Sequence, residues 1–241
     1  MLQKTRGIVL NHISYAESSL IVRIYTEDFG LQSYIVKGAR SKRSGMRVSM
    51  FQPMTLLQLL VYHRNNRDLQ NIREVSIEEP FHSIASDLRK STVSIFLAEI
   101  IYKAIKEHEA NKELFDFLAS SLNFFNMQSE GIENFHLYLL VMLSRFMGLQ
   151  PLPGDAGNYS FFDLREGKFS ASQPLHTEYL QGKASFGLYA LTITSASELG
   201  SLKLDKPTRD ELLNALLLYY QIHLHGMGSI KSLEVLRAVF S

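Results

Sequence analysis

About 75 residues at the start of the chain alternate between short apolar segments and polar, glycine-containing turns, the pattern of β-strands in a small sheet. Glu27 to Gly30 has the composition of a tight turn, because Gly30 can adopt a positive φ where the chain reverses. Five strands in so short a stretch favour a small closed barrel, since closure removes exposed strand edges. The predicted strands cover residues 8–10, 20–26, 31–37, 54–62 and 68–75.

The hydrophobic period changes from two residues to about 3.6 after Glu78-Glu79-Pro80, which indicates amphipathic helices. Residues 135–147 are apolar on nearly every side, so this segment is predicted to be a buried central helix. Thr208 and Glu211 are predicted to form a capping box at the start of a later helix. The other predicted helices cover 87–106, 114–125 and 233–240.

Residues 149–183 differ in kind from the helices around them. They contain three prolines and four glycines, and a short extended piece at 159–163 is followed by a tight turn at 163–168. We predict a small irregular insertion with one hairpin. The expected fold class is α+β and multidomain: a five-stranded β-barrel at 1–79, then an all-α helical domain at 80–241 that carries the insertion.

The composition excludes several classes of chemistry. The chain has 241 residues and no cysteine, so disulfides, thiolate zinc sites, iron–sulfur clusters and cysteine nucleophiles are excluded. With 46% hydrophobic and 20% charged residues, the chain is typical of soluble globular proteins. Its start lacks the apolar core of a secretion signal, and the longest apolar run, Leu137 to Leu143, is too short to span a bilayer. We expect a cytoplasmic protein with no membrane association.

Charge is distributed unevenly along the chain. Residues 1–80 hold eleven basic and seven acidic side chains, whereas the remainder holds fourteen basic and seventeen acidic ones. No acid occurs between Asp28 and Asp68, and this window contains a basic loop at 37–47 with two glycines and two serines. Lysine and arginine on a flexible loop suit phosphate oxygens, so the barrel is predicted to bind a polyanion. The basic residues of the window are Lys37, Arg40, Lys42, Arg43, Arg47, Arg64 and Arg67.

Sequence motifs of catalysis are missing. The sequence has no nucleophile elbow, no phosphate-binding loop and no dinucleotide fingerprint. His223 and His225 stand two residues apart on a predicted helix and point to different faces, which disfavours a shared metal ion. We therefore predict no enzymatic activity, no metal and no cofactor. Three interpretations fit the residues: a DNA-binding protein, an OB-fold adaptor for structured RNA, and a hydrolase or nuclease whose site is assembled from scattered acids and histidines.

Short motifs occur in a fixed order in both halves of the chain. In the first half they are 7–10, 15–20, 25–30 and 36–40, the last reading Val-Lys-Gly-Ala-Arg. In the second half they are Tyr219-Tyr220, His223-Leu224, Lys231-Ser232-Leu233 and Val235-Leu236. Each motif is modest alone, but the ordered set is specific and covers essentially the whole chain. The sequence resembles the RecO family of bacterial recombination mediators.

The resemblance implies a five-stranded OB-fold followed by a helical domain. It also implies binding of single- and double-stranded DNA, annealing of complementary strands, and binding of the acidic C-terminal tail of single-strand-binding protein. With RecR, members help the RecA recombinase load onto coated DNA in RecF-pathway repair, so nucleoid association is expected. OB-folds combine cations with aromatic stacking surfaces, which makes Tyr25 and Tyr34 candidates for stacking. Burial inside the barrel is the equal alternative for each ring. The implied DNA-binding residues are Lys37, Arg40, Lys42, Arg43, Arg47, Arg64, Arg67 and Tyr34.

The chain departs from the family pattern in the insertion. Many members hold zinc there with four cysteines, whereas 149–183 has no cysteine and only His176 as a histidine. We predict a metal-free remnant of the zinc module held by aromatic packing of Tyr159, Phe161, Phe162 and Phe169. The tail of single-strand-binding protein needs an apolar pocket rimmed by cations, for which the candidates are Arg145, Lys183 and Lys231.

Overall fold

The computed structural model describes residues 1–39, 46–64, 66–105, 109–154 and 158–240. The chain divides into two compact units, one formed by Met1–Met127 with Ile230–Ser241 and the other by Gln128–Ser229. The first unit therefore contains the barrel together with several helices. The predicted boundary between 1–79 and 80–241 stays a prediction.

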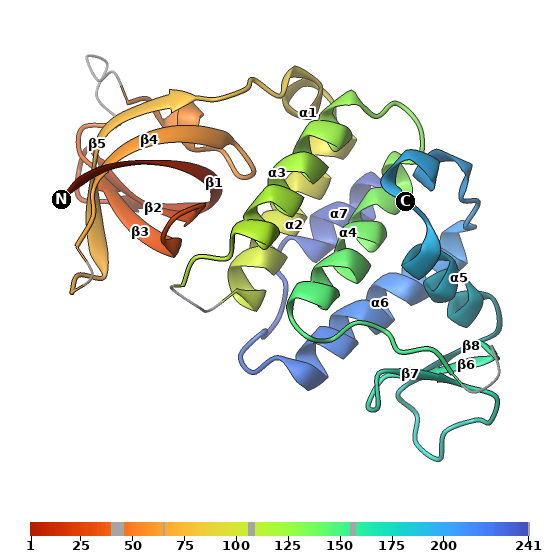
Figure 1. Cartoon of the computed structure of the whole chain (residues 1–241). Coiled ribbons are helices and arrows are strands. Elements are labelled where there is room, and N and C mark those ends of the chain that lie inside the picture. The colour runs from red at the N-terminus through yellow and green to blue at the C-terminus, as the bar shows by residue number, and fades with distance from the viewer. Residues whose placement is uncertain (40–45, 65, 106–108, 155–157, 241) are drawn as a thin grey trace. The chain divides into compact units, whose positions relative to one another are not determined.

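A closed five-stranded barrel occupies the start of the chain, in the order β1-β2-β3-β5-β4 (Figure 1). All neighbouring strands are antiparallel except β3 and β5, which pair in parallel over Ser33–Ile35 and Leu69–Asn71. The predicted OB-fold barrel, followed by helices, is confirmed. Its strands are β1 (Leu2–Tyr15), β2 (Ser19–Thr26), β3 (Gly30–Val36), β4 (Leu56–Tyr62) and β5 (Leu69–Ile77).

Strand β1 serves two neighbours, and this closes the barrel. Its first half pairs with β4, from Leu2 opposite Tyr62 to Ile8 opposite Leu56, and its second half pairs with β2. At Gly7 the strands come so close that a Cβ atom would lie 2.5 Å from Ile24 Cγ2, so only glycine fits. The short 3₁₀ helix η1 (Val48–Phe51) adds the fully buried ring of Phe51 to the barrel core.

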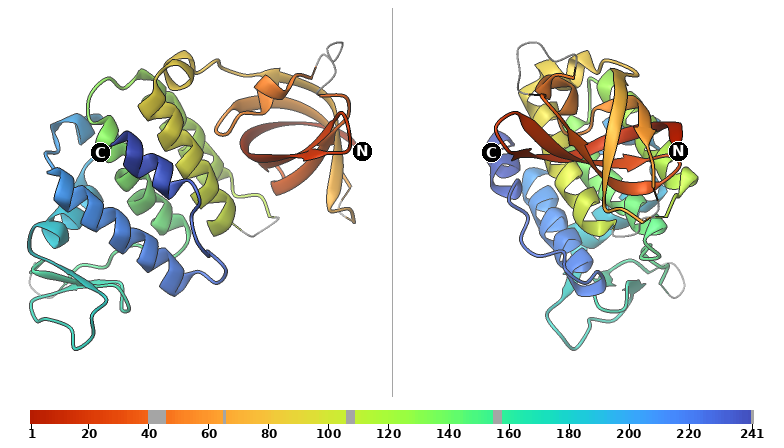
Figure 2. Two further views of the ribbon diagram at one scale, coloured as in Figure 1. Left: turned by 180° about the vertical axis from the view of Figure 1, so that it is seen from behind. Right: turned by 90° about the vertical axis from the view of Figure 1, so that its left-hand side faces the viewer.

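Among the described residues, the unit of the barrel also contains the helices α1 (His82–Ser86), α2 (Leu88–Ala104), α3 (Lys112–Met127) and α7 (Leu233–Val239). Helix α7 packs against α2 although more than a hundred residues separate them in sequence (Figure 2). The carboxylate of Glu99 on α2 accepts hydrogen bonds from Lys231 N and Ser232 N, at 3.0 and 2.9 Å, and from Ser232 Oγ at 2.7 Å. The half-buried carboxylate of Glu99 thus ties the C-terminal segment to α2.

The second unit consists of helices and a small sheet. Its elements are α4 (Ile132–Phe146), β6 (Phe161–Asp163), β7 (Lys168–Ser170), β8 (Tyr179–Gln181), α5 (Gly182–Ile193), the 3₁₀ helix η3 (Ala196–Ser201) and α6 (Lys206–His223). Helix α4 is buried along most of its length, as its sequence predicts, and Tyr220 on α6 donates a 2.8 Å hydrogen bond to Leu140 O. The insertion forms a three-stranded sheet in the order β7-β6-β8, one strand more than the predicted hairpin.

The predicted capping box at Thr208 and Glu211 is wrong. Helix α6 begins earlier, at Lys206, with Asp205 as its N-cap, and the Asp205 carboxylate accepts a hydrogen bond from Thr208 N at 2.9 Å. Asp205 outcompetes Thr208 as the cap because Pro207 fits the first helical turn, where the missing N–H has no helical partner anyway. A capping box does occur at Ser195 and Glu198, at the start of η3.

Candidate nucleic-acid interface

The basic loop leaves the barrel at the end of β3. Lys37 is exposed directly after the buried Val36, and Gly38 has φ +69, a backbone conformation that side chains disfavour. Ala39 is buried against the barrel core. The predicted contacts Arg40, Lys42 and Arg43 lie outside the described residues. The loop therefore begins with an exposed cation on an anchored backbone.

The loop also returns to an anchored position. Arg47 is exposed and immediately precedes η1, while Met46, Val48 and Met50 pack against the barrel core. His12 Nδ1 donates a 2.9 Å hydrogen bond to Phe51 O, which joins the end of η1 to β1. Both ends of the loop are thus fixed on the barrel, and each carries one exposed cation.

A second pair of cations, Arg64 and Arg67, lies in the loop between β4 and β5, and both side chains are exposed. The buried side chain of Gln70, 2% exposed, holds this loop from beneath. Its Nε2 donates to Arg64 O and Arg67 O, each at 2.7 Å, and its Oε1 accepts from Arg64 N at 3.1 Å. Three hydrogen bonds from one residue therefore fix the backbone that carries both arginines.

The two groups of cations lie at opposite ends of β3. Lys37 follows the last residue of β3, whereas Arg64 and Arg67 line a hollow shared with Phe29 and Gln32 at its beginning. A strand of seven residues is about 20 Å long. The described cations of the predicted DNA-binding set therefore form two separate sites on the barrel rather than one continuous patch.

The predicted stacking role of Tyr34 is wrong. Its side chain points into the barrel on the same face of β3 as Gln32 and Val36, with 0% exposed, and burial raises the pKa of its hydroxyl. Tyr25 is 1% exposed, and its hydroxyl donates to Asn111 O at 3.3 Å. Neither ring is open to a nucleobase.

Two other tyrosines on the barrel are exposed, Tyr15 at 49% and Tyr62 at 45%. Tyr15 pairs with Ser19, next to the pair formed by Leu20 and Val36. It therefore lies about two strand spacings, roughly 10 Å, from Lys37. The predicted first strand ended at residue 10 and so missed Tyr15, whereas β1 continues past a bulge between Val9 and Asn11 to Tyr15.

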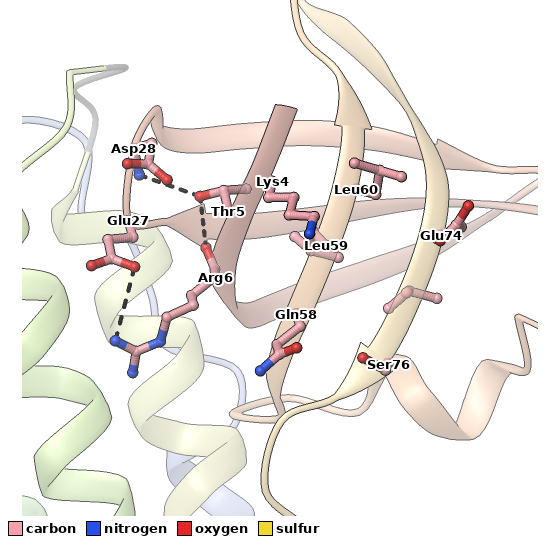
Figure 3. A pocket seen from close by; sticks show the side chains of 11 residues that line it. Lys4, Thr5, Arg6, Glu27, Asp28, Gln58, Leu59, Leu60, Glu74 and Ser76 are labelled. Carbon is pink, nitrogen blue, oxygen red and sulfur yellow. Dashed lines mark hydrogen bonds and ion pairs between the residues drawn. The ribbon is translucent and has the colours of Figure 1, made fainter. Parts of the chain in front are cut away.

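Arg6 faces a hollow on the outer surface of β1, β4 and β5 (Figure 3). Its guanidinium lies 3.1 Å from Glu78 and 3.8 Å from each of Glu27 and Asp116, and it sits 5.0 Å from the centre of the Phe115 ring. These partners hold the Arg6 side chain, 34% exposed, against Phe115 and Asp116 of α3. The Arg6 guanidinium is therefore already paired within the unit.

Models of the family described as recombination protein O match the chain in two parts, its N-terminal model at residues 1–81 and its C-terminal model at 85–234. The chain is 38% identical to the DNA repair protein RecO of Flavobacterium psychrophilum over 242 residues, covering 99% of both chains. It is 33% identical to the protein of that name from Azobacteroides pseudotrichonymphae and 36% identical to that from Bacteroides fragilis, covering 100% of each chain.

The chain belongs to the RecO family.

The insertion of this RecO chain does not fit the zinc that the resemblance associates with the family. It has no cysteine, and the described residues include no group of three metal-ligating side chains. Aromatic rings pack there as predicted: Phe169 lies 5.1 Å from Tyr159 and 4.8 Å from Phe162, between ring centres.

A polar cluster also holds the RecO insertion together. His176 Nε2 lies 3.1 Å from Asp163 Oδ2, while Asp163 Oδ1 accepts from Arg165 N and Glu166 N at 2.8 and 3.0 Å. Burial favours the neutral acid, but these hydrogen bonds outweigh it and lower the pKa of Asp163.

Among the described residues, none of the helices is long and apolar enough to cross a bilayer.

Proposed function

We propose that this RecO-family chain is a DNA-binding recombination mediator that acts in RecF-pathway DNA repair. It binds single- and double-stranded DNA, anneals complementary strands and, with RecR, helps load RecA onto DNA coated with single-strand-binding protein. The observation that carries the proposal is the basic loop: Lys37 and Arg47 are exposed at its two ends, both ends are fixed on the barrel, and no acid occurs between Asp28 and Asp68.

The chemistry of the loop suits the sugar–phosphate backbone. Lysine and arginine bind phosphate oxygens through charge-assisted hydrogen bonds that carry no sequence information. Tyr15 adds an exposed ring on which a base can stack. Annealing needs only that the repulsion between two backbones be reduced while the bases stay accessible, and a basic loop with the exposed cations Lys37 and Arg47 at its ends meets both requirements.

The proposed mediator catalyses no chemical reaction. It acts through its partners RecR, RecA and single-strand-binding protein. The acidic tail of single-strand-binding protein requires a cation, and three candidates differ in their surroundings. Arg145 donates to Thr192 O at 2.7 Å, Lys183 lies 3.2 Å from Asp205, and Lys231 follows the buried Ile230. All three side chains are exposed, that of Lys183 to 84%. Direct binding of RecR is part of the same proposal.

An annealing assay on complementary strands coated with cognate single-strand-binding protein tests this function. The full chain should accelerate annealing of naked and coated strands, and deletion of the tail of the coating protein should abolish only the acceleration on coated strands. Substitution of Arg40, Lys42 and Arg43 by glutamine should slow both reactions. Failure to accelerate annealing of naked strands would contradict the proposal, as would tighter binding to folded RNA than to unstructured DNA at equal salt.

A further inference from the structure

One mouth of the barrel contains a hollow of about 500 Å³, within the range of pockets that hold small molecules. It opens where the start of β1, the turn between β2 and β3 and the loop between β4 and β5 meet. All of its lining residues belong to the first unit. They are Gln3, Asp28, Phe29, Gln32, His63, Arg64, Arg67, Asp68, Gln70 and Ala110.

The walls of this mouth pocket are fixed before any ligand binds. Phe29 and His63 stack with ring centres 4.0 Å apart and an angle of 12° between their planes. Gln32 Nε2 donates to Phe29 O at 2.7 Å, and Gln70 holds the backbone of Arg64 and Arg67. A preorganised pocket loses little conformational entropy when a ligand binds.

Two buried polar atoms in the mouth pocket have no hydrogen-bond partner among the described residues: Gln3 Oε1 and His63 Nδ1. Buried polar atoms are nearly always paired, because leaving one unpaired is unfavourable. Gln3 lies on the inward-facing side of β1, at the end that opens into the pocket. Both residues line the pocket, so a ligand that reaches these buried atoms with its own hydrogen-bonding edge would satisfy them.

The charges of the mouth pocket are mixed. Arg64 and Arg67 line it together with Asp28 and Asp68, so a bare anion is not the ligand that fits best. A nucleotide complements side chains of both charges: its phosphate pairs with arginine, while the N–H groups of its base donate to carboxylate and amide oxygens. Guanine presents a ring N–H and an amino group on one edge, whereas thymine presents a single N–H.

We propose that the mouth pocket binds one unstacked nucleotide of a DNA strand, with its phosphate at Arg64 and Arg67 and its base edge toward Gln3. The pocket favours guanine over thymine because Gln3 Oε1 and the carboxylates of Asp28 and Asp68 are acceptors for the N–H groups of the guanine edge. This subsite rests on the proposed function, since it assumes that the chain binds DNA. It adds base recognition at one end of the barrel, about 20 Å from the basic loop that binds backbone.

Titration of the full chain with mononucleotides, followed by NMR, tests the subsite. Because one good base contact discriminates by about fivefold or more, dGMP should bind at least about fivefold more tightly than dTMP or 2-deoxyribose 5-phosphate. Gln3→Leu should remove this difference, and Gln58→Leu, an exposed glutamine on β4, should leave it unchanged. Arg67→Gln, at an exposed side chain, should lower the affinity for all three ligands alike. Equal binding of dGMP and the base-free sugar phosphate would overturn the proposal, as would no binding of dGMP.

A second experiment tests whether the pocket also binds a nucleotide that is part of a DNA strand. A thymidine oligonucleotide of about 20 residues should bind roughly threefold more tightly when one central thymidine is replaced by guanosine, and Gln3→Leu should abolish the gain. If the oligonucleotide binds but the guanosine gives no gain, the subsite is refuted and the proposed function stands. If no oligonucleotide binds at all, both are refuted.

Discussion

Gln70 and Arg64 hold each other through two hydrogen bonds: Arg64 N donates to Gln70 Oε1 at 3.1 Å, and Gln70 Nε2 donates to Arg64 O at 2.7 Å. The glutamine amide pairs with the loop backbone as a neighbouring strand would. Because Gln70 also binds Arg67 O, one buried side chain fixes the loop that presents two arginines at the mouth of the barrel.

Gln70→Ala should therefore affect stability and DNA binding together. It removes three hydrogen bonds and leaves backbone groups of the loop without partners, which costs about 1–3 kcal/mol for each buried group left unpaired. Urea unfolding should show a lower midpoint than in the wild type, and Gln58→Ala, at an exposed site, should not. Unchanged stability of Gln70→Ala would mean that the loop does not depend on this residue.

Glu99 should make the attachment of α7 sensitive to acid. Burial favours the neutral acid, but hydrogen bonds from Ser232 and Lys231 outweigh it and lower the pKa of Glu99 from 4.5 to about 2. A carboxyl whose pKa is depressed in the folded state stabilises that state above its unfolded pKa, and the contribution is lost as pH falls toward the folded pKa. It amounts to about 3 kcal/mol at most.

Hydrogen exchange of α7 measures this effect. Protection in the wild type should fall as pH drops from about 4.5 to about 2, after correction for the intrinsic pH dependence of exchange. Glu99→Gln should reduce the exchange protection of α7 already at neutral pH and make it less dependent on pH. Glu109→Gln, at an exposed site, should behave as the wild type. A steep profile in Glu99→Gln would assign the acid sensitivity to another group.

His176 should stabilise the cysteine-free insertion in place of a metal. His176→Ala removes the hydrogen bond to Asp163, and a hydrogen bond to a charged group contributes about 1.5–3 kcal/mol. Exchange protection in β6 and β8 should fall, while His225→Ala, at an exposed position, should leave it intact. A chelator should not change the melting temperature of the wild type. A clear drop on chelation would show that a metal holds this segment.

The exposed Tyr15, rather than the buried Tyr34, should stack on single-stranded DNA. Tyr15→Leu should weaken binding by about 1–3 kcal/mol, the contribution of one base–aromatic stack. Tyr34→Phe should leave DNA affinity unchanged, and its stability should be equal or higher because it removes a buried hydroxyl with no partner among the described residues. Fluorescence anisotropy with a labelled strand distinguishes the two. Unchanged binding in Tyr15→Leu would contradict stacking by Tyr15.

Alternation and turn composition were enough to predict the barrel, because its strands are rich in β-branched and aromatic residues. They missed the first part of β1, where Gln3, Lys4 and Arg6 are polar and the strand is defined by its ladder with β4. They also left open whether Tyr34 is exposed for stacking or buried in the barrel. Both faces of β3 carry apolar residues, Ile35 outward and Val36 inward, so hydrophobicity alone does not tell which face is buried.

The basic loop was visible in the sequence, since seven cations in an acid-free window are a local property of the chain. The mouth pocket was not visible. Its walls come from β1, the turn between β2 and β3, and the loop between β4 and β5, which only barrel closure brings together. The unpaired state of Gln3 and His63 depends on that same closure, so no pattern of neighbouring residues reveals it.

The salt dependence of single-strand binding is the most direct measurement of whether the basic loop grips the DNA backbone. If its five cations neutralise about five phosphates, they should contribute roughly −3.5 to the slope of log affinity against log salt, on strands of any sequence. Substituting Arg40, Lys42 and Arg43 by glutamine should reduce this contribution to roughly −1.4, because two loop cations remain.

The charge-matched control replaces Lys168, Lys203 and Lys206, which are exposed in the second unit, and should keep the wild-type slope. A slope near zero for the wild type, or an equal reduction in the control, would contradict backbone binding by the loop.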